Sequence, residues 1–570
     1  MIRPAARPDQ GSEATRHLCT GVYVDRKFRD MVLRKVHNAP GHRVSPSYGF
    51  DLVAVVRHAW RAWVLEIAQH AGVLSVLVIG YVLDAPAAVA AVSAMGLWPL
   101  GRKALRAVPE WLRLKSKIST ERWMRRRMSH AESSRLREQT RLLAISAGAC
   151  FVLVAIPMMV AGSQKVPLQE MARTAGQFLL VMIGVAAAAG AARQRRLNKL
   201  KTARSLRPAT LTRREAVIDN QQSHTYVVYR RPEPRDETED LPLLSDPRDE
   251  PTFFVGSGQL LHRWLPPLVI QLLRPGDGSL AQREYTAAPF KAHELVDHLR
   301  DAVERVRDAD DPIRLPGLQV RDRVYVAEKD IASDRECLRT NSGPGHLYNI
   351  IDDPHGIAAH FLEISVTTSG ELVTTVFLRV TIKGRSLSLD FAACAITGTP
   401  SGYHMLDAFA ESGKGAVLRS ALCGVRDFPA EIGRSWRLAE APLLFARAAW
   451  ARKDRTLVPR RRVTIGTRLS VRDEKSTPWD EAQFDEPVIL GQMKIIELCL
   501  IKATEEFLGR HNVDISSFKK RAENIISASV LNIGGRINIK DSTIGSGGQI
   551  NNNRGTNGAD GGTSPEGARP

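Results

Sequence analysis

The chain has few cysteines, few aromatic residues and no recognisable secretory signal. Only 6% of its 570 residues are aromatic, and it has six cysteines. They lie at Cys19, Cys150, Cys337, Cys394, Cys423 and Cys499. Because no two of them form a Cys-x-x-Cys pair, they argue against a disulfide framework or a structural zinc site and indicate a reducing compartment. Residues 1–62 contain neither an apolar signal core nor a small-residue cleavage site, so no cleaved signal peptide is predicted.

The sequence also lacks the common catalytic and nucleotide-binding motifs. Ser412–Gly415 fails the P-loop pattern, and Val255–Gly258 lacks the third glycine of a dinucleotide fingerprint, so a turn is predicted there. A few histidines and aspartates gather without a spacing that would converge them on a metal: His346, Asp352, Asp353, His355 and His360. We therefore predict no catalytic residue, no cofactor and no metal ligand, and we favour a non-enzymatic role. A catalytic set assembled only in three dimensions remains an alternative.

Charge is absent from long apolar runs in the first third of the chain. Leu142–Gly162 has no charged residue and supplies the roughly 20 apolar residues that a helix needs to cross the hydrocarbon layer. Gln177–Ala192 is shorter and rich in alanine and glycine, which suits close helix packing. Ala71–Leu100 is too long for one span and is interrupted at Asp84–Pro86, so we predict a hairpin. Together these runs predict four transmembrane helices, at about residues 63–83, 86–100, 142–162 and 176–192.

The charges between these runs predict the topology. The loop 101–140 holds 12 basic and 4 acidic residues, whereas the loop 163–174 holds only three charged residues. Because basic loops stay on the cytoplasmic side, the loop 101–140 and both termini are expected in the cytoplasm, with the protein in the cell membrane. Two cytoplasmic termini require an even number of crossings, which favours four spans over three. Buried helices of a large soluble protein are the alternative.

The basic loop also bears on the choice of partner. A net charge of +19 would ordinarily suggest nucleic acid. Here the basic residues flank apolar runs, so we predict anionic lipid headgroups as their partner and do not expect nucleic acid. The residues expected at the membrane surface are Arg113, Lys115, Lys117, Arg122, Arg125, Arg126 and Arg127. A solvated helical linker is the alternative interpretation of this loop.

After residue 201 the composition becomes that of a globular α+β protein. Three runs with β character, His360–Val366, Leu372–Ile382 and Leu387–Phe391, are joined by short glycine turns, which predicts an antiparallel β-meander. Helices are predicted at 290–306, 403–420, 428–452, 493–509 and from 516. The predicted organisation is a lead-in (1–62), a transmembrane region (63–192), an acidic and proline-containing linker (193–250), a cytoplasmic α+β domain (251–528) and a tail (529–570).

The tail has its own pattern. Large apolar residues recur at six-residue spacing among asparagine and glycine, a period typical of stacked short strands. Too few repeats are present for an autonomous solenoid, so stacking between chains would complete the structure and make a homo-oligomer. The predicted self-assembly residues are Ile533, Ile537, Ile539, Ile544 and Ile550. A disordered tail is the alternative.

Two stretches carry a resemblance to known families. Leu372–Leu378 in the meander and the Ile-Asn-Ile tail after a helix resemble uncharacterised multi-pass membrane proteins of actinobacteria. The tail also resembles bacterial amyloid-signalling motifs, which implies templated assembly. We therefore predict a membrane-anchored interaction, signalling or assembly protein whose cytoplasmic domain binds a protein partner. A membrane-bound enzyme without a recognisable motif and an oligomeric pore are the alternatives.

Overall fold

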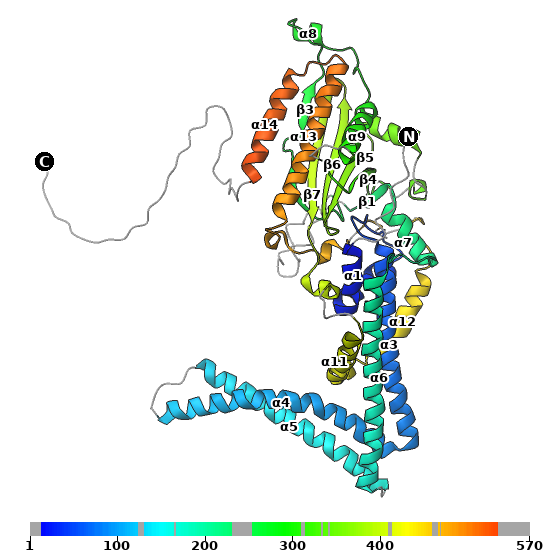
Figure 1. Ribbon diagram of the computed structural model, residues 1–570, viewed down its shortest axis with the longest axis vertical. Helices are drawn as coiled ribbons and strands as arrows, with labels where there is room; N and C mark the ends of the chain where they lie inside the picture. The colour runs from blue at the N-terminus through cyan, green and yellow to red at the C-terminus, as the bar shows by residue number, and fades with distance from the viewer. Residues whose placement is uncertain are drawn as a thin grey trace, which may run out of the picture.

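The molecule is elongated, with three regions along its long axis (Figure 1). A helical bundle lies at one end and a sheet domain at the other. Between them is a helical region that we call the neck, residues 13–70, 193–223, 401–407 and 437–451. This is a computed structural model, and it describes residues 13–123, 130–164, 167–230, 254–308, 314–331, 335–339, 343–407, 413–458, 465–467 and 469–533.

Four long helices run through or into the bundle: α3 (Leu52–Leu83), α4 (Ala85–Trp123), α5 (His130–Gln164) and α6 (Leu168–Thr202). Three segments of the described chain are long and apolar enough to cross a membrane, namely α3, residues 134–163 of α5, and α6. They indicate membrane association. The predicted fourth span, 86–100, is the first part of α4 and is not among these segments.

The break predicted near Asp84 separates α3 from α4. The backbone of Asp84 is extended, with φ of −153°, and its side chain accepts a hydrogen bond from the amide of Ala87 at 3.0 Å. The other carboxylate oxygen accepts a hydrogen bond from Thr174 of α6 at 3.0 Å. Asp84 therefore ends α3, caps the start of α4 and ties both to α6.

The neck contains helices in a segment that the sequence analysis treated as a polar lead-in. These elements are α1 (Glu13–Val24), α2 (Arg26–Met31), the π-helix η1 (Val32–His37), α7 (Arg213–Ser223), the 3₁₀-helix η4 (Ser401–Leu406) and α12 (Arg437–Trp450). Side-chain caps begin several helices: Asp25 caps α2, Asp51 caps α3, and Thr212 and Glu215 form a capping box on α7. Their apolar faces close around the first half of α3.

The sheet domain is built on one mixed sheet of seven strands. The strands are β1 (Tyr226–Tyr229), β2 (Gln259–Arg263), β3 (Leu268–Gln271), β4 (Leu318–Ala327), β5 (Ala358–Thr368), β6 (Leu372–Lys383) and β7 (Ser386–Ile396). Their order is β1-β4-β5-β6-β7-β2, with β3 also pairing with β7. The predicted meander is β5-β6-β7, and its pairs are antiparallel. The whole sheet is not antiparallel, because β1 runs parallel to β4.

Helices cover one face of this sheet and form the largest apolar core. The helical elements of the sheet domain are α8 (Leu280–Arg283), α9 (Ala292–Asp308), η3 (Glu336–Leu338), α10 (Pro344–Asp352), η6 (Asp473–Lys475), η7 (Trp479–Glu481), α13 (Glu486–Arg510) and α14 (Ser516–Ile533). The predicted helices at 290–306 and 493–509 correspond to α9 and α13. The predicted helix 403–420 is wrong, since η4 ends at Leu406 and α11 (Lys414–Ile432) begins after Gly413, whose φ is 94°.

Candidate functional site

Two helices connect the bundle to the neck without a break. In α3 the residues from Leu52 to His70 are mostly buried in the neck, whereas large apolar side chains after Ala71 are exposed. In α6 the order is reversed, since Leu180 and Val181 are exposed while Leu197 and Leu200 are buried in the neck core. The neck is therefore the place where the apolar bundle and the sheet domain are mechanically joined.

A buried network of ion pairs lies in the neck around Glu66 of α3. Its carboxylate pairs with Arg29 of α2, with Nη1 of Arg437 of α12 at 3.2 Å, and with Nε of Arg26 at 3.8 Å. Arg26 also pairs with Glu431 of α11. Glu66 and Arg29 are both nearly inaccessible to solvent, so each depends on the other for compensation of its buried charge. We call these five residues the Glu66 network.

A second polar cluster joins the neck to the sheet domain. The Nδ1 atom of His17 in α1 is bonded to Glu371, which follows the β5–β6 turn, and its Nε2 is 2.8 Å from Asp407. Thr399 donates its amide and its hydroxyl to Glu371 at 3.1 and 2.7 Å. His404 Nε2 lies 3.5 Å from the same carboxylate. We call these five residues the His17 cluster.

The charges within the His17 cluster determine the protonation states of His17 and Glu371. Burial alone would lower the pKa of His17, but the carboxylates of Glu371 and Asp407 raise it above its ordinary value. Burial alone would raise the pKa of Glu371, but hydrogen bonds from His17 and Thr399 lower it to about 2. The cluster is therefore suited to hold a protonated imidazole between two carboxylates.

Metal binding by this cluster is disfavoured by its geometry. Ligand atoms of His17, Glu371 and His404 lie within 4.8 Å of one another, and imidazole with carboxylate is a zinc-type donor set. However, the two imidazole rings lie one over the other, with centroids 4.0 Å apart and an interplanar angle of 31°. A nitrogen lone pair lies in the plane of its ring, so rings stacked in this way do not converge on one ion. Glu66, His70 and Glu431 form a second such group, but the surrounding arginines oppose a cation.

A third buried cluster lies on the second face of the sheet. Arg323 of β4 donates from Nε to Glu363 of β5 at 2.6 Å and from Nη1 to the carbonyl of His224 at 2.5 Å. Tyr48, which precedes α3, donates to the same carboxylate at 2.9 Å. Although burial alone would lower the pKa of Arg323, Glu363 raises it overall. This cluster fixes the segment before α3 to the sheet.

Part of the second face is left open by the residues that the structure describes. The helices that contact β6, namely α9, α10 and α13, all pack on the first face. On the second face, beyond the Tyr48 contact, the partly exposed side chains are polar except for one valine: Arg263, Val269, Arg379, Thr381, Ser388 and Asp390. Asp390 lies opposite Arg379 in the register and accepts from Arg263 Nη2 at 3.1 Å. We call these six residues the open face.

The structure places four of the predicted surface residues of the basic loop on α4. Arg113, Lys115 and Lys117 lie in the charged second part of α4, and the Lys115 Nζ atom is 4.6 Å from the ring centroid of Trp111. Arg122 lies near the end of α4, and Arg125, Arg126 and Arg127 lie outside the described residues.

The predicted tail residues are separated by the end of the last helix. Ile533 was expected in a strand, but it is the last residue of α14. Ile537, Ile539, Ile544 and Ile550 lie outside the described residues.

Sequence reasoning missed the residues of the Glu66 network and the His17 cluster. Most of their partners are hundreds of residues apart in the chain, so no local pattern marks them. One signal was present, because Glu66 and His70 stand four residues apart on one helix face beside an apolar run. Both residues fall within the predicted span 63–83, but they lie buried inside the neck.

Comparison with known families gives one match. Residues 267–540 match the family described as the AbeC-like domain, so this part of the chain is similar to that family. The match begins just before β3 and includes the remaining strands and helices through α14, with α11 and α12 among them. No curated protein matches the chain. No solved structure matches it either.

Proposed function

We propose that this protein is a multi-pass protein of the cell membrane that holds its α+β domain rigidly at the cytoplasmic surface and uses it to bind a protein partner. The observation that carries the proposal is the continuity of α3 and α6. At a rise of 1.5 Å per residue, a 32-residue helix such as α3 spans about 48 Å, enough to cross a bilayer core and reach well beyond it.

The proposed topology has four spans with both termini in the cytoplasm. The first part of α4 supports the fourth span, because its Ala87, Ala91 and Met95 pack in the bundle core together with Met182 of α6. The basic second part of α4 then runs sideways from α3 and α6, beside α5 (Figure 1). In this arrangement the basic residues of α4 bind anionic headgroups.

The neck makes the anchor rigid. The Glu66 network joins α2, α3, α11 and α12, while the His17 cluster joins α1 to the β5–β6 turn. A displacement of the sheet domain relative to α3 would separate buried charges, which is costly in a low-dielectric interior. Binding at the sheet domain is therefore coupled to the membrane helices, as signalling or ordered assembly requires.

The open face is the proposed partner site. Arg379 lies near its centre, opposite Asp390 and flanked along β6 by Thr381. Charged and hydroxyl side chains on a rigid sheet can form the hydrogen bonds of a specific interface.

Cross-linking in native membranes tests the partner proposal. The full chain, the Arg379→Glu variant and an Arg510→Glu control would be cross-linked in the source cells and recovered with the same tag. Arg510 is exposed on α13, on the helical side of the domain. We expect a defined protein to be captured by the full chain and the control and lost by at least about tenfold with Arg379→Glu. Equal capture by all three, or no specific capture, would contradict the proposal.

The tail is proposed to assemble with copies of itself. The described chain ends at the end of α14, and the six-residue isoleucine pattern follows there. A peptide of residues 527–554 is expected to form β-rich oligomers, whereas Ile539→Lys or Ile544→Lys blocks them by stacking like charges in one column. A wild-type peptide that stays a soluble coil at high concentration, like the lysine variants, would exclude this role.

A further inference from the structure

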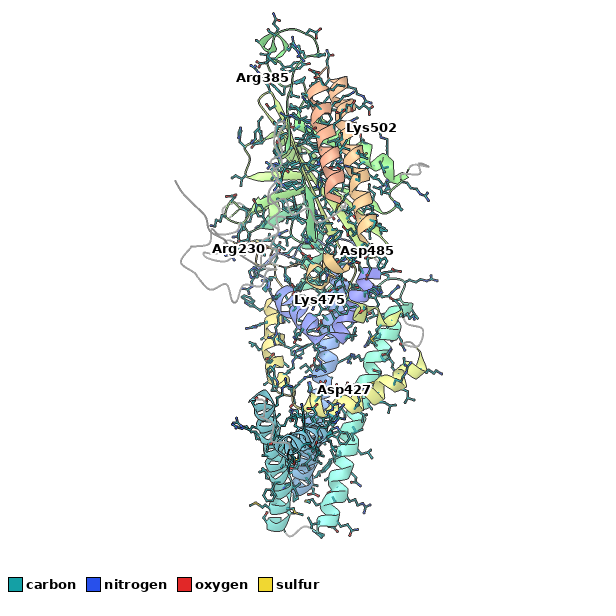
Figure 2. The ribbon with its side chains drawn as sticks, turned by 90° about the vertical axis from the view of Figure 1, so that its left-hand side faces the viewer. Arg230, Arg385, Asp427, Lys475, Asp485 and Lys502 are labelled. Atoms are coloured by element: carbon teal, nitrogen blue, oxygen red, sulfur yellow. The ribbon has the colours of Figure 1, made fainter. Side chains whose placement is uncertain are left out.

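Helix α11 belongs to the AbeC-like part of the chain, yet it packs on the membrane bundle. Its Phe428 is buried in the bundle core with Met182 and Ala186 of α6. In Figure 2, Asp427 marks α11 at the upper end of the bundle, where this helix lies across α6 rather than along it. A helix from the sheet-domain half of the sequence therefore lies at the level of the apolar segments.

Close backbone contacts fix the position of α11 along α6. A Cβ atom on Gly424 would lie 2.7 Å from the carbonyl oxygen of Ala186, and one on Gly190 would collide with the carbonyl of Ser420. Ser420 also donates its hydroxyl to the carbonyl of Gly190 at 2.9 Å. These contacts involve the last turns of the apolar run 177–192, immediately before Arg193, Arg195 and Arg196 of α6. This is the boundary between hydrocarbon and headgroups for a spanning helix.

The outward face of α11 carries large apolar side chains that are exposed. Leu418 and Leu422 are 65% and 61% exposed, and Trp436, just after α11, is 62% exposed. Leu418 and Leu422 stand at i and i+4, so they share one face of the helix. Arg419 and Arg426 stand seven residues apart beside that face. Exposed leucine and tryptophan with nearby arginine are typical of a helix that lies in the membrane interface.

We infer that α11 lies in the plane of the bilayer surface, with Leu418, Leu422 and Trp436 inserted among the lipids of the leaflet that faces the sheet domain. The inference rests on the membrane anchoring proposed above and extends it to a second, non-spanning contact. The occupant of this face is an anionic lipid bilayer, because α11 packs on the apolar run of α6, exposes leucine and carries arginine. The interface helix gives the AbeC-like region its own membrane contact, separate from the spanning helices.

Fluorescence quenching in reconstituted vesicles tests this arrangement. Three variants of the full chain would each carry one labelled cysteine, introduced as Leu422→Cys, Leu180→Cys or Leu280→Cys. In all three, serine replaces the native cysteines Cys150, Cys337, Cys423 and Cys499. Leu180 is the reference inside the apolar run of α6, and Leu280, 63% exposed on α8, is the matched control at the far end of the sheet domain. The vesicles would contain phosphatidylcholine and phosphatidylglycerol, with either brominated lipid or aqueous iodide as the quencher.

The expected result is that brominated lipid quenches the label at Leu422 about threefold more than the label at Leu280, as befits a side chain in the acyl boundary. Iodide should quench the label at position 280 but not the label at position 422. Iodide quenching at Leu422 equal to that at Leu280 would overturn the inference, as would protection of Leu422 from both quenchers, which would mean that another protein copy covers the face. If Leu180 also fails to respond to brominated lipid, the anchoring proposal itself fails. Unchanged unfolding temperatures of the three labelled chains would show that each is folded.

Discussion

The two halves of α3 occupy different surroundings within one unbroken helix. Leu52, at its first position, is 1% exposed, whereas Leu83, at its last, is 73% exposed. The first half buries charged residues as well, since Glu66 and His70 are both enclosed by the neck. The second half exposes apolar side chains that water would not favour.

This contrast shows that sequence hydrophobicity alone does not distinguish a protein core from a lipid-facing surface. Both halves belong to one helix that counts as a single candidate span. The burial pattern separates them, because side chains that face protein are covered while those that face lipid remain exposed in the isolated chain. Whether each half of α3 faces protein or lipid is therefore best tested by making the same kind of substitution in both halves.

The largest effect is expected from removing the central charge of the neck half. Glu66→Ala leaves Arg29 and Arg437 buried without their shared carboxylate, which should lower the free energy of unfolding by about 3–5 kcal/mol. The exposed pair Glu506–Arg510 on α13 supplies the control, because Glu506→Ala should change stability by less than about 0.5 kcal/mol. Denaturant unfolding in detergent micelles would measure the stability of both variants. Equal losses would show that the Glu66 network stabilises the protein no more than an exposed ion pair does.

A matched pair of leucine-to-alanine substitutions compares the two halves of α3 directly. Leu52→Ala should cost about 2–5 kcal/mol because it empties space in the neck core. Leu83→Ala removes contacts with lipid or detergent rather than with protein, so its effect should stay within about 0.5 kcal/mol. Similar losses from the two variants would mean that the second half of α3 is packed against protein in the native membrane.

A second matched pair sharpens the comparison on α6. Gly190→Ala should destabilise by about 1–3 kcal/mol, because its methyl group collides with the backbone of α11. Gly184→Ala meets no atom within 4 Å and should be neutral or stabilising, since alanine favours helix more than glycine by about 1 kcal/mol. Thermal unfolding of the two variants would test whether α11 is seated on α6, and equal melting temperatures would contradict that seating.

The smallest expected effect is the pH dependence of the His17 cluster. Because the pKa of His17 is raised, its contribution to stability is complete below its ordinary value of 6.5 and is lost as pH rises through the raised value. The lowered pKa of Glu371 adds stability above its ordinary value of 4.5, which is lost as pH falls towards about 2. The stability difference between the native chain and His17→Gln should therefore be largest between pH 4.5 and 6.5. The exposed His355→Gln is the control, and a difference independent of pH would exclude the ion-pair interpretation.

The sequence predicted those parts of the fold whose signals are local. The meander β5-β6-β7 follows from alternating β-branched residues and two glycine turns, so its first two strands were found close to their observed bounds, whereas β7 extends to Ile396, five residues beyond the predicted end. The neck was missed because Arg26 and Glu431, or His17 and Glu371, meet only after the chain has folded. Helix α11 was assigned to the soluble domain because an amphipathic helix has the same periodicity whether its apolar face meets a core or a membrane. The partner site and the tail remain predictions.

Reporter fusions provide the most direct test of the central claim. The claim is that the chain leaves the neck along α3, crosses the membrane and returns to the neck along α6. Truncations of the chain would be fused to a reporter after Lys117, Gln164 or Leu200 and expressed in cells. The four-span topology predicts a cytoplasmic signal after Lys117 and Leu200 and an exterior signal after Gln164. An exterior signal after Lys117 would contradict it, because the basic part of α4 would then lie on the opposite side of the membrane from the sheet domain.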